Sequence, residues 1–217
     1  MLRILFEKKG RAVWVSHLDL MRLFQRAFKR AGLKLKHTQG FNPRPSVSIA
    51  LPLSVGVDSS CELLDFELET PVNCDMLPDM LNSKLVEGVR VLQAYEGGSK
   101  IRDLAYLRCH VTLEYDAGVP DGAGECLTEL FKRDEVIVPK KTKSGIQDQN
   151  LIPMICDMTV IGRENHILLD TIVCCQNPTL NPAQLVKAIE QYLPQYAPDF
   201  STCSRIEVYN KNNEIFR

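Results

Sequence analysis

Apolar residues near the start of the chain recur with the spacing of an α-helix. The apolar residues at positions 20, 24, 27, 28 and 31 follow the i, i+4, i+7, i+8, i+11 spacing of one side of a helix. Ser16 precedes this stretch as an N-cap, with Asp19 three residues later, and Gly32 follows it as a stop. The pattern therefore predicts a helix between Ser16 and Gly32 with one apolar face.

Other segments alternate apolar and polar residues or gather β-prone residues, which is typical of strands. By this criterion strands are expected at residues 2–7, 12–15, 33–37, 46–51, 62–69, 89–95, 107–115, 135–138, 152–161, 166–174 and 205–209. Further helices are expected at about residues 75–87, 123–133 and 182–192. The strand at 62–69 is expected to have an acidic outer face, because Asp65, Glu67 and Glu69 alternate with apolar residues.

The order of these elements is similar in the two halves of the chain. Each half contains a strand, a helix, two or more strands, a helix and a strand, which is the βαββαβ order of a ferredoxin-like unit. The glycines at 97–98 mark the boundary between the halves. The sequence thus predicts an α+β fold of two tandem ferredoxin-like units with antiparallel sheets. The first covers 1–97, and the second covers 101–217 and carries a basic loop at 140–150.

Composition narrows the class of protein. The chain has 217 residues, of which 45% are hydrophobic and 24% charged, as in ordinary globular proteins. The longest nearly apolar stretch, 49–57, is far shorter than the roughly 18 to 20 residues that a membrane span needs. Residues 1–10 carry four charges and lack the apolar core of a signal peptide. We expect a cytoplasmic protein without membrane contact.

The cysteines give no sign of a metal site. There are eight, and no two of them have the C-x-x-C spacing of zinc or iron–sulfur ligands. Each lies within or beside an apolar run, where a free thiol behaves as a small buried hydrophobic residue. We therefore expect no metal and no cofactor.

Charge is distributed unevenly along the chain. Residues 1–45 hold 11 Lys and Arg against 2 Asp and Glu, a net charge of +9. The remaining residues hold 15 basic and 25 acidic side chains, a net charge of −10. Such an asymmetry indicates an anionic partner, unless the acidic strands neutralise the basic segment within the molecule.

The basic residues form a candidate nucleic-acid interface. Arginine holds phosphates bidentately and lysine adds point charges, so contact with a phosphate backbone is the natural functional interpretation, against that of a solvated helix face. Phe41 is the candidate for stacking on a base, whereas Trp14 is expected to pack in the core. The candidate binding residues are Arg22, Arg26, Lys29, Arg30, Lys34, Lys36, His37, Phe41, Arg44, Lys140, Lys141 and Lys143.

One histidine is a candidate for acid–base chemistry. His17 stands at the first position of the basic helix, where the positive end of the helix dipole favours the neutral imidazole that a general base needs. The alternative, a surface or packing histidine, is the commoner role of such a residue.

Three segments resemble a known bacterial family. They are Ser16–Arg22 (SHLDLMR), Gln39–Pro45 (QGFNPRP) and Ala50–Val57 (ALPLSVGV). In these segments the chain closely resembles the radical-SAM-associated family of unknown function. The resemblance implies a small protein encoded beside, or fused to, a radical SAM protein, which names a partner and no reaction. The chain lacks the three-cysteine motif of radical SAM enzymes, so any radical chemistry belongs to that partner.

Three functions are consistent with these features. The first is a non-catalytic accessory protein that binds RNA and acts with the radical SAM enzyme in RNA modification. The second is a metal-independent endoribonuclease using His17, similar to CRISPR-repeat-processing enzymes, although residues 210–217 lack the glycine-rich loop of those enzymes. The third is a docking module that meets a protein partner through the acidic strand or the basic helix.

Overall fold

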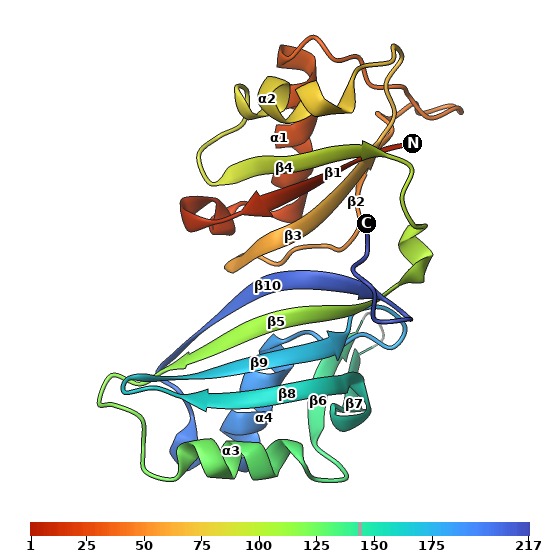
Figure 1. Ribbon diagram of the computed structural model, residues 1–217. Coiled ribbons are helices and arrows are strands. Elements are labelled where there is room, and N and C mark those ends of the chain that lie inside the picture. Colours follow the sequence, from red (N-terminus) through yellow and green to blue (C-terminus); the bar gives the residue numbers. More distant parts are fainter. Residues whose placement is uncertain (143–144) are drawn as a thin grey trace. The chain divides into compact units, whose positions relative to one another are not determined.

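The computed structural model describes residues 1–142 and 145–217 and divides them into two compact units. The first unit comprises residues 1–101 together with Arg217, and the second comprises residues 102–216. Each is a mixed α+β structure with two α-helices and an antiparallel sheet (Figure 1). None of the helices in the described parts of the chain is long and apolar enough to cross a membrane.

The first unit places two helices on a four-stranded sheet. Its elements are β1 (Leu2–Lys8), α1 (His17–Arg30), β2 (Val47–Ile49), β3 (Val57–Phe66), α2 (Leu77–Asn82) and β4 (Val89–Glu96). The strand order is β4-β1-β3-β2, and all neighbours are antiparallel. The central pair β1 and β3 aligns Leu2 with Phe66.

The predicted helix at the start of the chain is confirmed. Ser16 Oγ accepts a hydrogen bond from the backbone N–H of Asp19 at 3.2 Å, which caps α1. Gly32 follows the helix at φ +74°, a conformation that favours glycine and ends the helical turn. The apolar face of α1 packs on the sheet through two aromatic pairs, Phe6 with Phe24 and Phe28 with Phe66, each with ring centroids 4.7 Å apart.

Several expected elements in this unit differ from those observed. The strand expected at residues 12–15 is not formed; Gly10–Trp14 instead form a 3₁₀ turn. The expected strand at 33–37 makes only isolated bridges, Leu35 with Leu68 and His37 with Pro45. The expected helix at 75–87 is limited to a 3₁₀ turn followed by the six residues of α2.

The acidic outer face expected at 62–69 is only partly observed. Glu69 is exposed and Glu67 is half-buried, but Asp65 is buried. It lies opposite Arg3 of β1, whose side chain is completely buried. The Arg3 guanidinium donates to both carboxylate oxygens of Asp65, at 2.5 and 3.0 Å, and to the carbonyl oxygen of Ser99 at 2.9 Å. A pair of opposite charges therefore sits inside the first unit and joins its two central strands.

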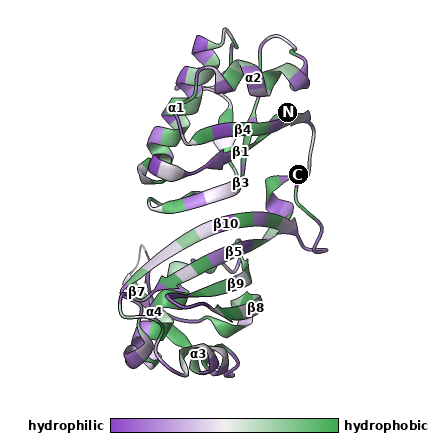
Figure 2. Ribbon diagram, turned by 60° about the vertical axis from the view of Figure 1, so that its left-hand side comes forward, coloured by the Kyte–Doolittle hydropathy of each residue, from purple (hydrophilic) through white to green (hydrophobic). Residues whose placement is uncertain are grey.

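The second unit has a similar sheet and an added hairpin. Its elements are β5 (Leu104–Glu114), α3 (Ala123–Phe131), β6 (Ile137–Thr142), β7 (Gly145–Asn150), β8 (Ile155–Gly162), β9 (His166–Cys174), α4 (Ala183–Tyr192) and β10 (Phe200–Asn210). Within this unit the sheet order is β10-β5-β9-β8, again antiparallel. The alternation predicted at 107–115 is confirmed, since Leu107, Val111 and Leu113 are buried. Figure 2 shows the mixture of hydrophilic and hydrophobic residues along these strands.

The basic segment expected as a loop at 140–150 is strand wherever it is described. Residues 140–142 belong to β6 and residues 145–150 form β7, with Lys140 opposite Gln147 and Lys141 opposite Ile146. Alternation of residues in this segment is weak, which is why the sequence suggested a loop. Lys143 lies outside the described residues.

The cysteines occupy both buried and exposed positions. All eight are free thiols; Cys61 and Cys109 are buried, as expected of core residues, whereas Cys156 on β8 is exposed. Its Sγ lies 4.0 Å from that of Cys174 on β9. Partial desolvation of its sulfur, together with the neighbouring Cys174 thiol, raises the pKa of Cys156 to about 11, so it stays protonated at neutral pH. No group of three or more His, Cys, Asp or Glu side chains placed to hold a metal occurs among residues 1–142 and 145–217.

The Arg3–Asp65 pair leads to a stability prediction. Changing Asp65→Asn should lower the free energy of unfolding by about 3–5 kcal/mol, because a buried guanidinium loses its counter-charge. Urea denaturation followed by circular dichroism measures this change. The control Asp79→Asn, at an exposed position on α2, should change stability by less than about 0.5 kcal/mol. Equal effects of the two substitutions would contradict the assignment.

A second ion pair makes the second unit sensitive to acid. Arg108 on β5 donates hydrogen bonds of 2.9 and 2.6 Å to the two carboxylate oxygens of Asp170 on β9. These hydrogen bonds hold the pKa of Asp170 below its ordinary value of 3.8. The stabilisation is therefore complete above that value and is lost as the pH falls through the lower pKa of the folded state.

Thermal unfolding between pH 2.5 and 7 tests this dependence. At neutral pH an Asp170→Asn variant should melt at a lower temperature than the unmodified protein, because the charged pair is lost. The difference should shrink below about pH 4, where the unfolded chain begins to bind a proton at Asp170, and should be lost once the folded protein is protonated there as well. A difference that stays constant across the range would show that Asp170 contributes through packing alone.

Candidate nucleic-acid interface

The exposed side of α1 carries a row of arginines. Arg22, Arg26 and Arg30 are four residues apart, so their Cα atoms are about 6 Å apart along the helix axis. All three are exposed, while Phe24 and Phe28 on the opposite side are fully buried. The buried face thereby fixes the rotation of the helix and directs the arginines to solvent. We call these three residues the arginine ridge.

Most of the cations around the ridge are not neutralised. Arg22 pairs with Asp19 at 3.0 Å, and Lys36 pairs with Glu67 at 3.4 Å. Hydrogen bonds from Ser16 and then from Arg22 lower the pKa of Asp19, which keeps this carboxylate charged. In the described residues, no carboxylate oxygen lies within 4.0 Å of a side-chain nitrogen of Arg26, Lys29, Arg30, Lys34 or Arg44. These five cations remain available to an anionic ligand.

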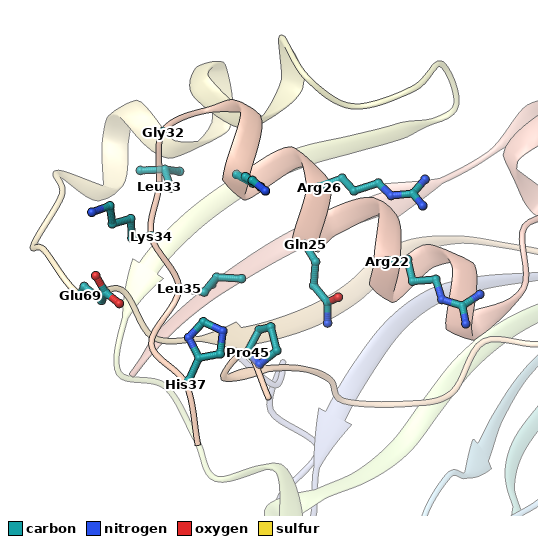
Figure 3. Close-up of a pocket in the computed structure, with 11 residues that line it drawn as sticks. Arg22, Gln25, Arg26, Gly32, Leu33, Lys34, Leu35, His37, Pro45 and Glu69 are labelled. Carbon is teal, nitrogen blue, oxygen red and sulfur yellow. The ribbon is translucent and has the colours of Figure 1, made fainter. Parts of the chain in front are cut away.

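A pocket of about 680 Å³ lies on one side of the ridge (Figure 3). Its apolar floor consists of Leu33, Leu35 and Pro45. The polar lining comes from the ridge and from residues next to it. These are Arg22, Gln25, Arg26, Lys29, Lys34, His37 and Glu69.

The wall of this pocket opposite α1 is held by backbone hydrogen bonds. The N–H of Glu69 donates to the carbonyl oxygen of Lys34 at 2.9 Å, and the N–H of Lys36 donates to that of Glu67 at 2.9 Å. On the other side, the N–H of Ser46 donates to the carbonyl oxygen of Lys36 at 2.7 Å. Residues 34–37 are therefore fixed between two neighbouring segments, and the pocket is formed before any ligand arrives.

A second pocket of about 500 Å³ lies on the other side of the ridge. Arg22 and Arg26 line both pockets, whereas Arg30 lines only the second, together with Lys84. Its apolar contribution comes from Val15, Leu23 and Val86. The second pocket is therefore bordered by four cations and a single carboxylate, Asp19, and it lies next to the first pocket with its apolar floor.

The structure brings some predicted residues together and separates others. Arg22, Arg26, Lys29, Lys34 and His37 line the first pocket, and Arg30 joins them through the second. Lys36 instead borders another hollow, with Leu2 and Glu67.

The remaining candidates stand apart from these pockets. Phe41 is fully exposed, and Arg44, in the same 38–44 segment, is also exposed and donates its backbone N–H to Thr38 Oγ1 at 3.0 Å. Lys140 and Lys141 belong to the second unit, where Lys140 Nζ donates to the carbonyl oxygen of Thr179 at 3.2 Å. The Lys140 ammonium group thus already makes a hydrogen bond within its own unit.

Three residues that line the pockets or lie next to α1 were missed or misassigned from the sequence. Trp14 was expected in the core, but 68% of it is exposed, because it ends a 3₁₀ turn that leads directly into α1. Gln25 lines the first pocket and could have been found, because it lies three residues after Arg22 and four before Lys29 on a helix. Lys84 comes from a distant part of the chain, and its local sequence gives no signal of this position.

His17 is the first residue of α1 and is half-buried. Its Nδ1 is buried and has no hydrogen-bond partner among the residues that the structure describes. No carboxylate or nucleophile in a described contact orients this imidazole for catalysis.

The chain matches the model of one protein family and resembles a solved structure in its fold. The family model described as "Uncharacterized protein conserved in bacteria (DUF2344)" matches residues 1–182. No curated protein matches the chain.

Two solved structures are among those that match the chain. One is a chain in the crystal structure of a Cbf5-Nop10-Gar1 complex, with a TM-score of 0.53 and 9% identity. The match covers 95% of this protein and 48% of that chain, so the protein spans about half of its length and resembles it in fold alone. The other is the crystal structure of an unknown protein from Galdieria sulphuraria, with a TM-score of 0.26 and 11% identity. That match covers 94% of this protein and 96% of the other, but a likeness this slight carries no argument.

Proposed function

Because this chain belongs to the DUF2344 family of bacterial proteins, whose description names no activity, we propose its function from its own surface. The protein binds RNA as a non-catalytic accessory protein and acts with a radical SAM enzyme in RNA modification. The observation that carries the RNA-binding part is the arginine ridge, flanked by two pockets and supplemented by Lys29, Lys34 and Lys84.

The geometry of the ridge favours a polyanion over a single small anion. Its charges extend along two helical turns instead of converging on one point. Arginine and lysine that contact successive phosphates release counterions, and this release drives non-specific nucleic-acid binding. A phosphate backbone is therefore the ligand that uses all of these cations together.

The proposal also includes the fold assignment and the partner. The strand orders β4-β1-β3-β2 and β10-β5-β9-β8, with a βαββαβ order of elements in each unit once the β6–β7 hairpin is set aside, support the classification as tandem ferredoxin-like units. The radical SAM partner is supported by the resemblance in residues 16–22, 39–45 and 50–57.

A second candidate function, docking to a protein partner, is favoured by exposed apolar side chains at the start of α1. Trp14, Leu18 and Val55 are 68%, 67% and 53% exposed. The backbone N–H of Gly56 donates to the carbonyl oxygen of Val13 at 2.9 Å, which ties the segment of Val55 to that of Trp14. Exposed aromatic and aliphatic side chains of this kind are typical of protein-binding surfaces. This surface is the proposed contact for the radical SAM protein.

The salt dependence of RNA binding tests the first function. A variant with Arg22, Arg26 and Lys29 changed to alanine should bind RNA more weakly, and its logarithmic affinity should fall less steeply with salt. Each lost phosphate contact reduces the slope by about 0.7 to 0.9. Filter binding with one defined single strand between 50 and 300 mM salt measures both quantities.

The matched control removes the same charges elsewhere. Arg102, Arg163 and Lys187 are exposed residues of the second unit, and changing all three to alanine should leave the slope unaltered. Equal losses in the two variants would show that binding depends on net charge and not on the ridge. No binding by the unmodified protein at 50 mM salt would refute the proposal.

Docking has its own test. A Trp14→Ala, Leu18→Ala variant should co-purify about tenfold less with the proposed radical SAM partner than the unmodified protein does, because it lacks two apolar contacts. The control Ile146→Ala removes an apolar side chain that is 75% exposed on β7 and should have no effect. Unchanged association of the double variant would rule out this surface as the contact.

A further inference from the structure

We infer that the pocket between α1 and residues 33–37 holds one unpaired nucleotide of the bound RNA, with its base on the apolar floor and its phosphate on the arginine ridge. This inference rests on the proposed function and goes beyond it. It states that the protein recognises an unstacked base and not only a phosphate backbone.

The floor of the pocket suits the flat face of a base. Leu33 and Leu35 are 6% and 8% exposed, so each presents only an edge of its side chain to the pocket. Pro45 adds a rigid apolar ring, and His37 adds an aromatic ring from the wall (Figure 3). Nucleobases bind on aromatic and apolar side chains irrespective of sequence, because every base has a π face.

A polar group is placed for the edge of the base. Gln25 lies on α1 within the pocket lining, and its amide extends from the helix toward Pro45 (Figure 3). Within the described chain, this amide has no hydrogen-bond partner. An amide supplies both donors and an acceptor, which is the combination that reads a hydrogen-bonding edge of a base.

The charges around the pocket determine at which end of it the phosphate of the nucleotide lies. Arg22 and Arg26 lie between this pocket and the second one, whereas Glu69 lies beside Lys34 at the opposite end (Figure 3). A phosphate is attracted to the ridge and repelled by Glu69. The strand therefore leaves the pocket across the ridge toward Arg30 and Lys84 in the second pocket.

A free mononucleotide fits this arrangement less well than a strand does. It can occupy the floor and one part of the ridge, but it leaves the cations of the second pocket without a partner. A duplex is also disfavoured, because a paired and stacked base must be extruded before it can reach the floor, which costs a few kcal/mol. The expected ligand is a single strand or a loop.

The experiment compares two strands of equal charge. One is a twelve-nucleotide oligouridylate, and the other has the same sugar–phosphate backbone without bases. Fluorescence anisotropy at 100 mM salt should show the unmodified protein binding the oligouridylate about tenfold more tightly, which corresponds to about 1.4 kcal/mol. Uridine monophosphate at 1 mM should not displace the strand.

A variant that fills the pocket without changing its charge completes the test. Gln25→Trp places a bulky ring over the floor and should reduce the ratio of the two affinities to about one, while the salt dependence stays unaltered. The control Met76→Trp adds the same ring just before α2, at a position that is 56% exposed and lines neither pocket, so the ratio should stay near ten.

The outcomes separate the inference from the proposed function. Steep salt dependence with equal affinity for the two strands would overturn the nucleotide pocket and leave RNA binding intact. Absence of binding to both strands would overturn both proposals. Displacement by 1 mM uridine monophosphate would make a free nucleotide the ligand, and a ratio unchanged in Gln25→Trp would place base recognition elsewhere.

Discussion

The packing of α1 on its sheet determines where the candidate interface lies. Phe24 contacts Phe6 of β1 and Phe28 contacts Phe66 of β3, so the helix is held against both central strands of the first unit. Because the arginines lie on the opposite side of the same helix, this apolar contact fixes their direction. It also sets the distance between α1 and the segment 33–37, and thereby the width of the pocket beside the ridge.

Some of the basic residues among the first 45 are not part of the candidate interface. Arg3 and Lys8 are completely buried; Arg3 pairs with Asp65, and Lys8 Nζ donates to the carbonyl oxygen of Val15 at 3.0 Å. Lys36 pairs with Glu67. The asymmetry of charge along the sequence thus combines buried cations, which are used within the fold, with exposed ones. Only the exposed cations can take part in the proposed binding, and their largest group lies on α1.

The two pockets of the proposed interface differ in chemistry. One combines an apolar floor with an amide and an imidazole, and the other is bordered mostly by cations. A ligand with a flat apolar part and a string of negative charges matches both, which is the chemistry of a single-stranded nucleic acid. The apolar side chains at Trp14, Leu18 and Val55 are a separate surface, suited to a protein partner that would receive the bound strand.

The sequence by itself determined α1, its cap at Ser16, its buried face and its row of arginines, because these depend on residues three and four apart along one helix. It also indicated most strands of both units through their period of two. It did not reveal that Asp65 is buried, that Trp14 is exposed, that residues 140–150 form much of a hairpin, or that Lys84 borders the ridge. Each of these depends on what another segment, distant in sequence, places beside the residue. Only the tertiary structure decides such neighbours, because local periodicity specifies which face of an element is apolar and not what covers it.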